Sequence, residues 1–242
     1  MTILVESTST SDGFSKYFEI LPAISDSEKA AAFRIRHSVY CEDLEWESTR
    51  ADGMEMDAYD AHALHCLIRS RASGDFIGCV RLILTEPGDP HAPLPFEQTC
   101  GPALHRTLVD PAKMPRDRIA EVSRLAIVGQ YRRRRGEKHT PAGSVQDSEP
   151  GNTEQPRFAW LLIGLYMGVF AIAARHGLEH LCLLSEPRLA RHLNKIGITN
   201  VQIGKPTEHR GFRAPAVMDV HQVIGNLEPL LKSVFTHVNA QL

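Results

Sequence analysis

The residues best suited to chemistry begin with three carboxylates close together. Glu55, Asp57 and Asp60, here called the acidic cluster, fall within six positions of the stretch DGMEMDAYDAHALHCLIRS, directly before a strand-like apolar run. Neighbouring acids repel one another unless cations face them, because like charges at short range disfavour ionisation. The cluster therefore predicts basic partners elsewhere in the chain. The alternative is a solvated acidic loop.

Basic and aromatic side chains with suggestive spacing lie on both sides of the acidic cluster. Glu121 and Arg124 are three positions apart on an expected strand, so they would face opposite sides of a regular strand. If both serve one site, we expect a bulge or kink between them. Taken singly, each arginine–carboxylate pair could instead be a surface ion pair contributing about 0–1 kcal/mol. The full set of candidates is Arg36, Tyr40, Trp46, Arg81, Phe96, Glu121 and Arg124.

Such a set suits a small molecule that carries both an amine and an acid. Asp57 and Asp60 could bind an ammonium group, and an arginine could bind a carboxylate through two parallel hydrogen bonds. An amino acid or its derivative offers both groups. Glu121 could remove a proton from the amine, directly or through water. The alternatives are that Glu121 is a structural partner of an arginine, and that the charged set only fixes the N-terminal loop.

The elements that must position these residues follow from periodicity and from helix and strand breakers. Strands are expected at 16–21, 62–70, 76–85, 118–128, 180–186, 199–204 and 214–220, and helices at 25–44, 158–174, 187–197 and 221–237. Ser25 and Ser27 are candidate N-caps of the first helix. This order favours an α/β (α+β) fold with a central mixed, mostly antiparallel sheet and helices on both faces.

Length and composition favour one domain with a substantial core. We expect a flexible N-terminus at 1–15, a single domain at 16–242 and a flexible, low-complexity insertion at about 136–157. Five cysteines without a CxxC pair favour free thiols, and no secretory signal opens the chain, so we expect a cytoplasmic protein. The apolar run at 158–174 approaches the length of a membrane span, but its strand-like neighbours favour a core helix.

The pattern of the candidate residues resembles the acyl-homoserine lactone synthases. These autoinducer synthases have the GNAT (Gcn5-related N-acetyltransferase) fold. The resemblance covers roughly residues 30 to 130, with Tyr40 in place of the usual phenylalanine. It implies catalytic roles for Glu121, Arg124 and Arg81. It also implies substrate-binding roles for Arg36, Tyr40, Trp46, Asp57, Asp60 and Phe96.

Three further segments resemble the acyltransferases associated with the PEP-CTERM/exosortase protein-sorting system. They are SRLAIVGQYRRRRGE, LSEPRLARHLNKIGI and IGKPTEHRGFRAP. That group is related to the autoinducer synthases and to the N-acyl amino acid synthases. The resemblance favours an amine acceptor other than S-adenosylmethionine.

The same resemblances place the acyl donor after the strand at 118–128. In GNAT proteins the backbone of the corresponding strand stabilises the oxyanion, so the resemblance implies this role for the backbone near Ala126, Ile127 and Val128. The segment QYRRRRGE stands where those proteins bind a pyrophosphate, although Lys138 replaces the second small residue. A single phosphate of phosphopantetheine, or an acidic acyl carrier protein, is therefore expected there. The residues concerned are Arg132, Arg133, Arg134 and Gly136. Leu193 occupies the position of the general-acid tyrosine of many GNAT enzymes.

The sequence thus predicts an N-acyltransferase that moves a fatty acyl group from acyl carrier protein, or acyl-CoA, to a small amino-acid-like acceptor. One alternative is an acyl-homoserine lactone synthase that uses S-adenosylmethionine. Another is a non-catalytic sensor of acyl chains or carrier protein. No metal, tightly bound cofactor, integral membrane span or nucleic-acid partner is expected, because no metal signature such as HExxH occurs and the net charge is −2.

Overall fold

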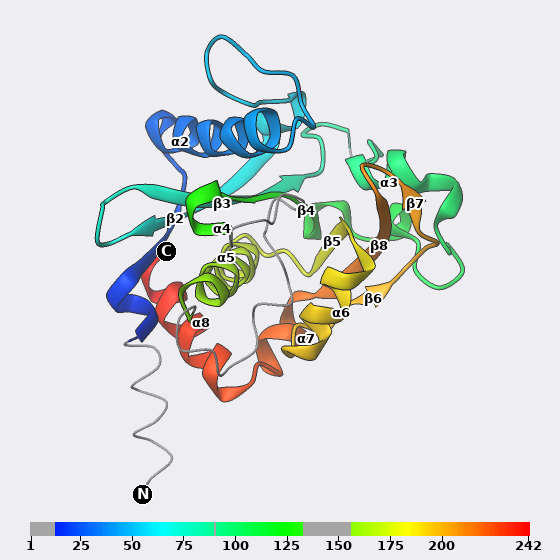
Figure 1. Ribbon diagram of the computed structural model, residues 1–242. Coiled ribbons are helices and arrows are strands. Elements are labelled where there is room, and N and C mark those ends of the chain that lie inside the picture. Colours follow the sequence, from blue (N-terminus) through cyan, green and yellow to red (C-terminus); the bar gives the residue numbers. More distant parts are fainter. Residues whose placement is uncertain (1–12, 90, 133–155) are drawn as a thin grey trace, which may run out of the picture.

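The computed structural model describes residues 13–89, 91–132 and 156–242. The strands form one mixed sheet in the order β1-β2-β3-β4-β5-β8-β6, and β7 pairs with β8 at its side (Figure 1). Among the strands of the described residues, only β4 and β5 run parallel, and every other pair is antiparallel. The predicted fold class is confirmed. The strands are β1 (Phe18–Pro22), β2 (Ala63–Ser70), β3 (Phe76–Leu84), β4 (Ile119–Ile127), β5 (His180–Ser185), β6 (Val201–Gln202), β7 (Thr207–Glu208) and β8 (Phe212–Asp219).

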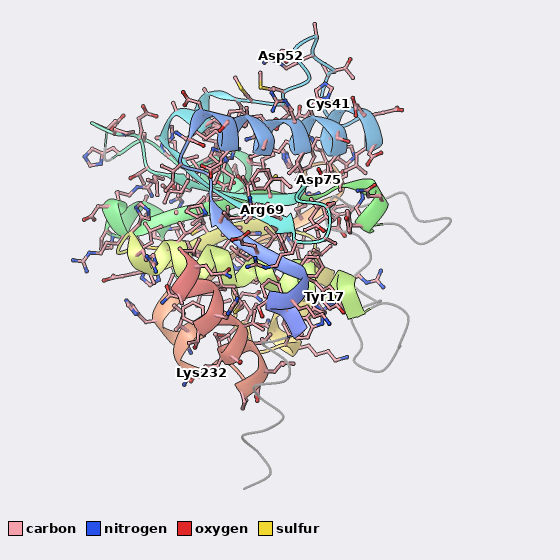
Figure 2. The ribbon with its side chains drawn as sticks, turned by 90° about the vertical axis from the view of Figure 1, so that its left-hand side faces the viewer. Tyr17, Cys41, Asp52, Arg69, Asp75 and Lys232 are labelled. Carbon is pink, nitrogen blue, oxygen red and sulfur yellow. The ribbon has the colours of Figure 1, made fainter. Side chains whose placement is uncertain are left out.

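Helices cover both faces of the sheet. Helix α2 lies on one face, and α5 lies on the other with α8 packed against it (Figure 1). Figure 2 shows the same layers from the side, with Asp52 on a loop beyond α2 and Lys232 on α8 at the opposite surface. The helices are α2 (Asp26–Arg36), α3 (Pro95–Cys100), α4 (Gly129–Arg132), α5 (Pro156–Arg175), α6 (Pro187–Lys195), α7 (Val220–Gly225) and α8 (Pro229–Gln241).

The first helix begins where the sequence predicts. The Ser25 side chain accepts a hydrogen bond from the backbone of Glu28, and the Glu28 carboxylate binds the Ser25 N–H at 2.8 Å. This reciprocal capping box fixes the start of α2. The expected helix continues to residue 43, but it widens into a π-helix, η1 (His37–Asp43). Phe14, within the N-terminus expected to be flexible, is fully buried, whereas 1–12 lie outside the described residues.

The apolar helix α5 packs on the sheet, as predicted for 158–174. A Cβ on Gly168 would lie 2.5 Å from the Cys66 sulfur, and one on Gly164 would lie 2.7 Å from the Phe14 ring. The two glycines therefore allow the helix to approach β1 and β2 closely. Across the described ranges, no helix has the length and hydropathy that a bilayer span requires.

The C-terminal third differs from the prediction in two places. The helix expected at 221–237 is two helices, because α7 ends at Gly225 and Pro229 begins α8. The strand expected at 199–204 is only two residues long, and the short strand β7 forms a hairpin with the start of the predicted last strand, β8. Arg210 and Gly211 form its turn with positive φ values of 54° and 93°. The insertion predicted at 136–157 lies almost entirely outside the described residues.

Candidate active site

A bulge in β4 brings two candidate residues to one cavity. Opposite the single residue Val80 of β3, strand β4 holds two residues, Arg124 and Leu125. Arg124 has φ of +52°, a left-handed conformation that residues other than glycine seldom adopt. The extra residue changes the facing of the strand, so Glu121 and Arg124 line the same cavity. The predicted bulge is present.

Two buried arginines face the acidic cluster. Arg36 of α2 is fully buried; its Nε donates to Glu55, and its two terminal nitrogens donate to Asp60 at 2.7 and 3.1 Å. Arg81 of β3 is 2% exposed and binds both oxygens of Asp57 at 2.7 and 3.0 Å. A further bond of 2.7 Å joins Arg81 to Asp60. The acidic cluster is therefore a paired, internal network and not a solvated loop.

Arg124 completes this network from the bulge. Its Nη2 lies 3.1 Å from Glu55, 3.3 Å from Asp57 and 3.2 Å from Glu47. Burial opposes the ionisation of Glu55, but hydrogen bonds and charge from Arg36 and Arg124 outweigh it and lower its pKa. Four carboxylates and three arginines thus hold α2, β3 and β4 to the loop before β2.

The pKa of Asp60 lies well below its ordinary value. Burial works against ionisation there too, but the hydrogen bonds and charge of Arg36, together with the charge of Arg81, dominate. The loop itself is rigid, because Asp57 caps the short 3₁₀-helix η2 (Ala58–His62) by accepting from the Tyr59 N–H at 3.0 Å. Asp60 accepts from the Asp57 N–H at 2.8 Å. Both aspartates are therefore oriented before any ligand arrives.

A polar cavity of about 300 Å³ opens beside this network. Glu121 lines it, and its carboxylate accepts a hydrogen bond from the backbone N–H of Phe96 at 2.7 Å. In the described parts of the chain Glu121 forms no ion pair, so the structural role considered for it is absent. Burial raises the pKa of Glu121 to about 7, although the Phe96 N–H and the charges of Arg81 and Arg124 oppose the shift. A carboxyl group with that pKa is suited to proton transfer at neutral pH.

Stacked aromatic and cationic groups form one side of the polar cavity. The ring centres of Tyr40 and Trp46 lie 6.1 Å apart. Arg124 lies over Tyr40 and Arg213 lies over Trp46, each with 5.5 Å between the guanidinium carbon and the ring centre. The Tyr40 hydroxyl donates to the carbonyl oxygen of Leu125 at 2.9 Å, which fixes the stack to the bulge.

An apolar cavity of about 150 Å³ lies on the other side of the bulge, next to α5 and α6. The parallel ladder between β4 and β5 ends at Val122 and Leu183, although β4 continues to Ile127. The two strands therefore separate, and the cavity occupies the space between them. Val169, Phe170, Leu189 and Leu193 are among its lining residues. Tyr40, Val122, Ser123, Arg124, Leu184 and Arg213 line both cavities.

The predicted donor-binding residues lie apart from this cavity wall. Ala126 and Ile127 are fully buried, and the Val128 N–H is bonded to the Ile77 carbonyl oxygen at 3.0 Å. The β4 residues that line the apolar cavity are those of the preceding segment, 122–125. Arg132 is buried and donates to Asp43 at 2.6 Å. Arg133, Arg134 and Gly136 lie outside the described residues.

Sequence reasoning did not assign Glu47, Ser123, Arg210 or Arg213 to the site. Glu47 binds Arg210 at 2.7 Å, and the Ser123 hydroxyl accepts from Arg81 at 3.1 Å. Arg210 and Arg213 belong to the segment RGFRAP, and its two closely spaced arginines were the available signal for them. Glu47 and Ser123 lie directly beside the candidates Trp46 and Arg124, and this adjacency was the only signal for them.

Comparison with known proteins agrees with the fold and with the region of the site. Residues 35–141 match the family described as an acetyltransferase (GNAT) domain, which is less than half of the chain. An acyl-homoserine-lactone synthase of Vibrio anguillarum is 28% identical over 69 residues, which are 28% of this chain and 36% of the relative. The alignment thus spans about a third of that relative's length.

Two solved structures resemble nearly the whole chain. BjaI, a CoA-dependent acyl-homoserine lactone synthase bound to SAM and isopentyl-CoA, matches with a TM-score of 0.59 at 18% identity, covering 92% of this chain and 89% of BjaI. FeeM, an N-acyl amino acid synthase from uncultured soil microbes, matches with a TM-score of 0.53 at 14% identity, covering 88% of this chain and 96% of FeeM. The chain therefore has the fold of the GNAT-like acyltransferases. The family match and these relatives support an acyltransferase.

Proposed function

We propose that this protein is an N-acyltransferase that moves a fatty acyl group from a thioester donor to the amino group of a small amino-acid-like acceptor. One observation carries the proposal: an apolar cavity and a polar cavity meet at the β4 bulge. The polar cavity contains Glu121, a buried carboxyl group with a pKa of about 7. An acyl chain fits the first environment and an amine fits the second.

The first chemical requirement is a neutral amine. An aliphatic ammonium has a pKa about 2–3 units above neutrality, so its deprotonation costs roughly 3–4 kcal/mol. Glu121 can accept that proton, since it is partly ionised near pH 7 and the Phe96 N–H holds it in place. The paired network of the acidic cluster supplies rigid support for this wall. It leaves Asp57 and Asp60 less able to bind an ammonium than the sequence suggested, since arginines already bind both.

The second requirement is stabilisation of the oxyanion while bonds exchange. The amine nitrogen attacks the thioester carbon, a C–N bond forms, and the carbonyl oxygen gains negative charge. Backbone N–H groups of 123–125 lie where β4 separates from β5 and are the candidate donors. The C–S bond then breaks, Glu121 gives the proton that it took from the ammonium to the leaving sulfur, and it takes the second proton from the nitrogen and later releases it to water. The products are an amide and a free thiol.

The donor is proposed to be acyl carrier protein or acyl-CoA, since both present the thioester on phosphopantetheine. The apolar cavity also contains two polar groups. The hydroxyls of Tyr166 and Ser185 are buried and have no hydrogen-bond partner among the residues the structure describes. An amide of the pantetheine arm could supply the missing bonds. The arginine run of QYRRRRGE favours a carrier protein as partner, and the resemblance to the PEP-CTERM/exosortase acyltransferases favours an acceptor other than S-adenosylmethionine.

A second candidate is an acyl-homoserine lactone synthase. BjaI has this activity and is bound to SAM, and the polar cavity of this chain would also suit the amino-acid part of such a molecule. Both candidates need the same base and the same oxyanion donors. They differ in whether the acylated product afterwards closes to a lactone.

The test is product analysis with the purified chain. Decanoyl and hexadecanoyl thioesters of CoA and of acyl carrier protein are incubated with twenty amino acids and, separately, with S-adenosylmethionine. Mass spectrometry then identifies the products. N-acyl amino acids support the first proposal and acyl-homoserine lactones the second. Binding of the donor without product, in the wild type as in Glu121→Gln and Arg124→Ala, would indicate a non-catalytic sensor.

A further inference from the structure

One cation at the polar cavity has no carboxylate partner in the described parts of the chain. Four arginines line this cavity, and three of them, Arg81, Arg124 and Arg210, form ion pairs with carboxylates of the protein. The fourth, Arg213, forms none within the described ranges. Its Nε donates to the carbonyl oxygen of His209 at 2.9 Å, and its two terminal nitrogens make no hydrogen bond to any described residue.

The neighbours of Arg213 restrain it without occupying those terminal nitrogens. It lies near the start of β8, directly after the turn of the short hairpin. Its guanidinium stacks over the ring of Trp46, which itself packs against Tyr40. Stacking fixes the plane of a guanidinium while the N–H groups at its edge remain free to bind. Arg213 is thus oriented as a binding group before a ligand arrives.

The partial burial of the Arg213 cation favours the binding of an anion beside it. Burial of this half-buried cation lowers its pKa, and the charge of Glu186, which forms no ion pair with Arg213 in the described chain, offsets that effect only in part. Glu121 is the complementary case, a carboxyl group at the same cavity that pairs with no arginine among the described residues. One unpaired acid–base group and one unpaired cation therefore line a single cavity. An α-amino acid presents a proton-bearing nitrogen and a carboxylate on adjacent atoms.

We propose that Arg213 binds the α-carboxylate of the acceptor, so that the preferred acceptor is a free α-amino acid whose amino group faces Glu121. The inference rests on the acyltransferase function proposed above. Two terminal N–H groups of a guanidinium match a carboxylate through parallel hydrogen bonds. Arg213 also lines the apolar cavity, where a phosphate of the donor could bind it by the same chemistry. The experiment must therefore distinguish the acceptor's carboxylate from the donor's phosphate.

The experiment compares Arg213→Gln with wild type on matched acceptors and donors. The acceptors are an amino acid from the panel that wild type acylates and its α-amide, which lacks the negative charge. The donors are decanoyl-CoA and decanoyl-N-acetylcysteamine, which carries no phosphate. Arg191→Gln is the control, because Arg191 is exposed on α6 and, of the residues the structure describes, binds only the carbonyl oxygen of Pro187, at 3.3 Å.

For Arg213→Gln we expect kcat/KM for the amino acid to fall on the order of 100-fold, with less than about threefold change for the amide. This loss should be equal with both donors, and Arg213→Lys should recover part of it. Equal loss for acid and amide, or no loss for either, would overturn the inference. Loss confined to the phosphate-bearing donor would assign Arg213 to the donor instead. If wild type acylates no acceptor, the proposed function itself fails.

A binding measurement separates positioning from folding. Trp46 lies against Arg213, and Trp160 is the other tryptophan, so the fluorescence of a Trp160→Phe variant reports on Trp46. Titration with the amino acid should change this signal at a concentration that rises at least tenfold in the additional Arg213→Gln variant. Titration with the amide should give weak binding in both. An unchanged concentration for the amino acid would contradict the assignment, whatever the effect on turnover.

Discussion

The carboxylate of Glu121 accepts a hydrogen bond from the backbone N–H of Phe96 at 2.7 Å. This single neutral donor holds a buried acid that shares its cavity with four arginines but pairs with none within the described chain. A hydrogen bond of this kind orients the group without the strong shift toward ionisation that an ion pair imposes. The arrangement separates Glu121 from Asp60 and Glu55, whose charges are permanently engaged.

Turnover should decrease as Glu121 becomes protonated. The pKa of Glu121 is raised to about 7, so kcat should fall as pH decreases below about 7 and level off above it. Glu121→Gln should remove this dependence together with at least roughly 100-fold of the rate. The measurement is kcat against pH from 5 to 9 at saturating acceptor and donor. A wild-type profile without an inflection between pH 6 and 8 would contradict the role.

The raised pKa of Glu121 also makes stability depend on pH, with a sign opposite to that of turnover. A carboxyl group whose pKa rises from 4.5 to about 7 on folding binds protons more tightly in the folded state. The free energy of unfolding therefore decreases as pH rises from about 4.5 to 7, by up to about 3 kcal/mol. Glu121→Gln should gain stability relative to wild type between pH 5 and pH 8, as judged from urea unfolding. A constant difference across this range would show that Glu121 is not protonated at low pH in the folded protein.

Asp60→Asn should destabilise the fold strongly. The substitution leaves Arg36 and Arg81 buried with one carboxylate fewer, and breaking a buried pair typically costs 3–5 kcal/mol. The measurement is the free energy of unfolding at pH 7. Asp52→Asn is the matched control, since Asp52 pairs with Arg50 on the outer loop shown in Figure 2 and should leave the unfolding midpoint nearly unchanged. Equal effects of the two substitutions would contradict the network.

Leu189→Trp should shorten the acyl chains that the protein accepts. Leu189 lines the apolar cavity, whose volume of about 150 Å³ leaves little space for a larger side chain. We expect kcat/KM for a hexadecanoyl donor to fall at least tenfold relative to a hexanoyl donor, because about 0.8 kcal/mol is lost for each methylene group left unburied. Leu230→Trp on the exposed side of α8 is the control. An unchanged chain-length preference would place the acyl group elsewhere.

Gly168→Ala should cost stability although alanine is the better helix former. The new Cβ would lie 2.5 Å from the Cys66 sulfur and 2.8 Å from a methyl group of Ile20, and overpacking of this kind typically costs 1–3 kcal/mol. Gly225→Ala places a methyl group in open space and should be neutral or stabilising. Thermal unfolding of the two variants tests the comparison. A Gly168→Ala variant as stable as wild type would mean that α5 can move away from the sheet.

Much of the fold follows from short-range patterns. Ser25, one of the two candidate N-caps, begins α2, and the strands expected at 62–70 and 76–85 are β2 and β3. The bulge at Arg124 was predicted from a requirement of the site, since two residues three apart had to reach one cavity. Local spacing carries this information because each feature depends on neighbours within a few residues.

The features that were missed depend on long-range geometry. That Asp57 and Asp60 are saturated by arginines depends on how α2, β3 and β4 meet, which no local pattern encodes. Arg213 is recognisable as a free cation only once its hairpin is placed against Trp46. The break between α7 and α8 is the one missed feature that local sequence indicates, because Pro229 favours the start of a new helix.

The wall shared by the two cavities constrains how selectivity can diverge. A substitution at Val122 or Ser123 alters the environment of both reactants at once, whereas Gln98 touches only the polar cavity and Val169 only the apolar one. Substitutions at positions that line one cavity alone can therefore change the selectivity for one substrate, while the other substrate is bound as before. Mutant libraries aimed at new lipid products should randomise the positions that line a single cavity and keep the residues that line both cavities unchanged.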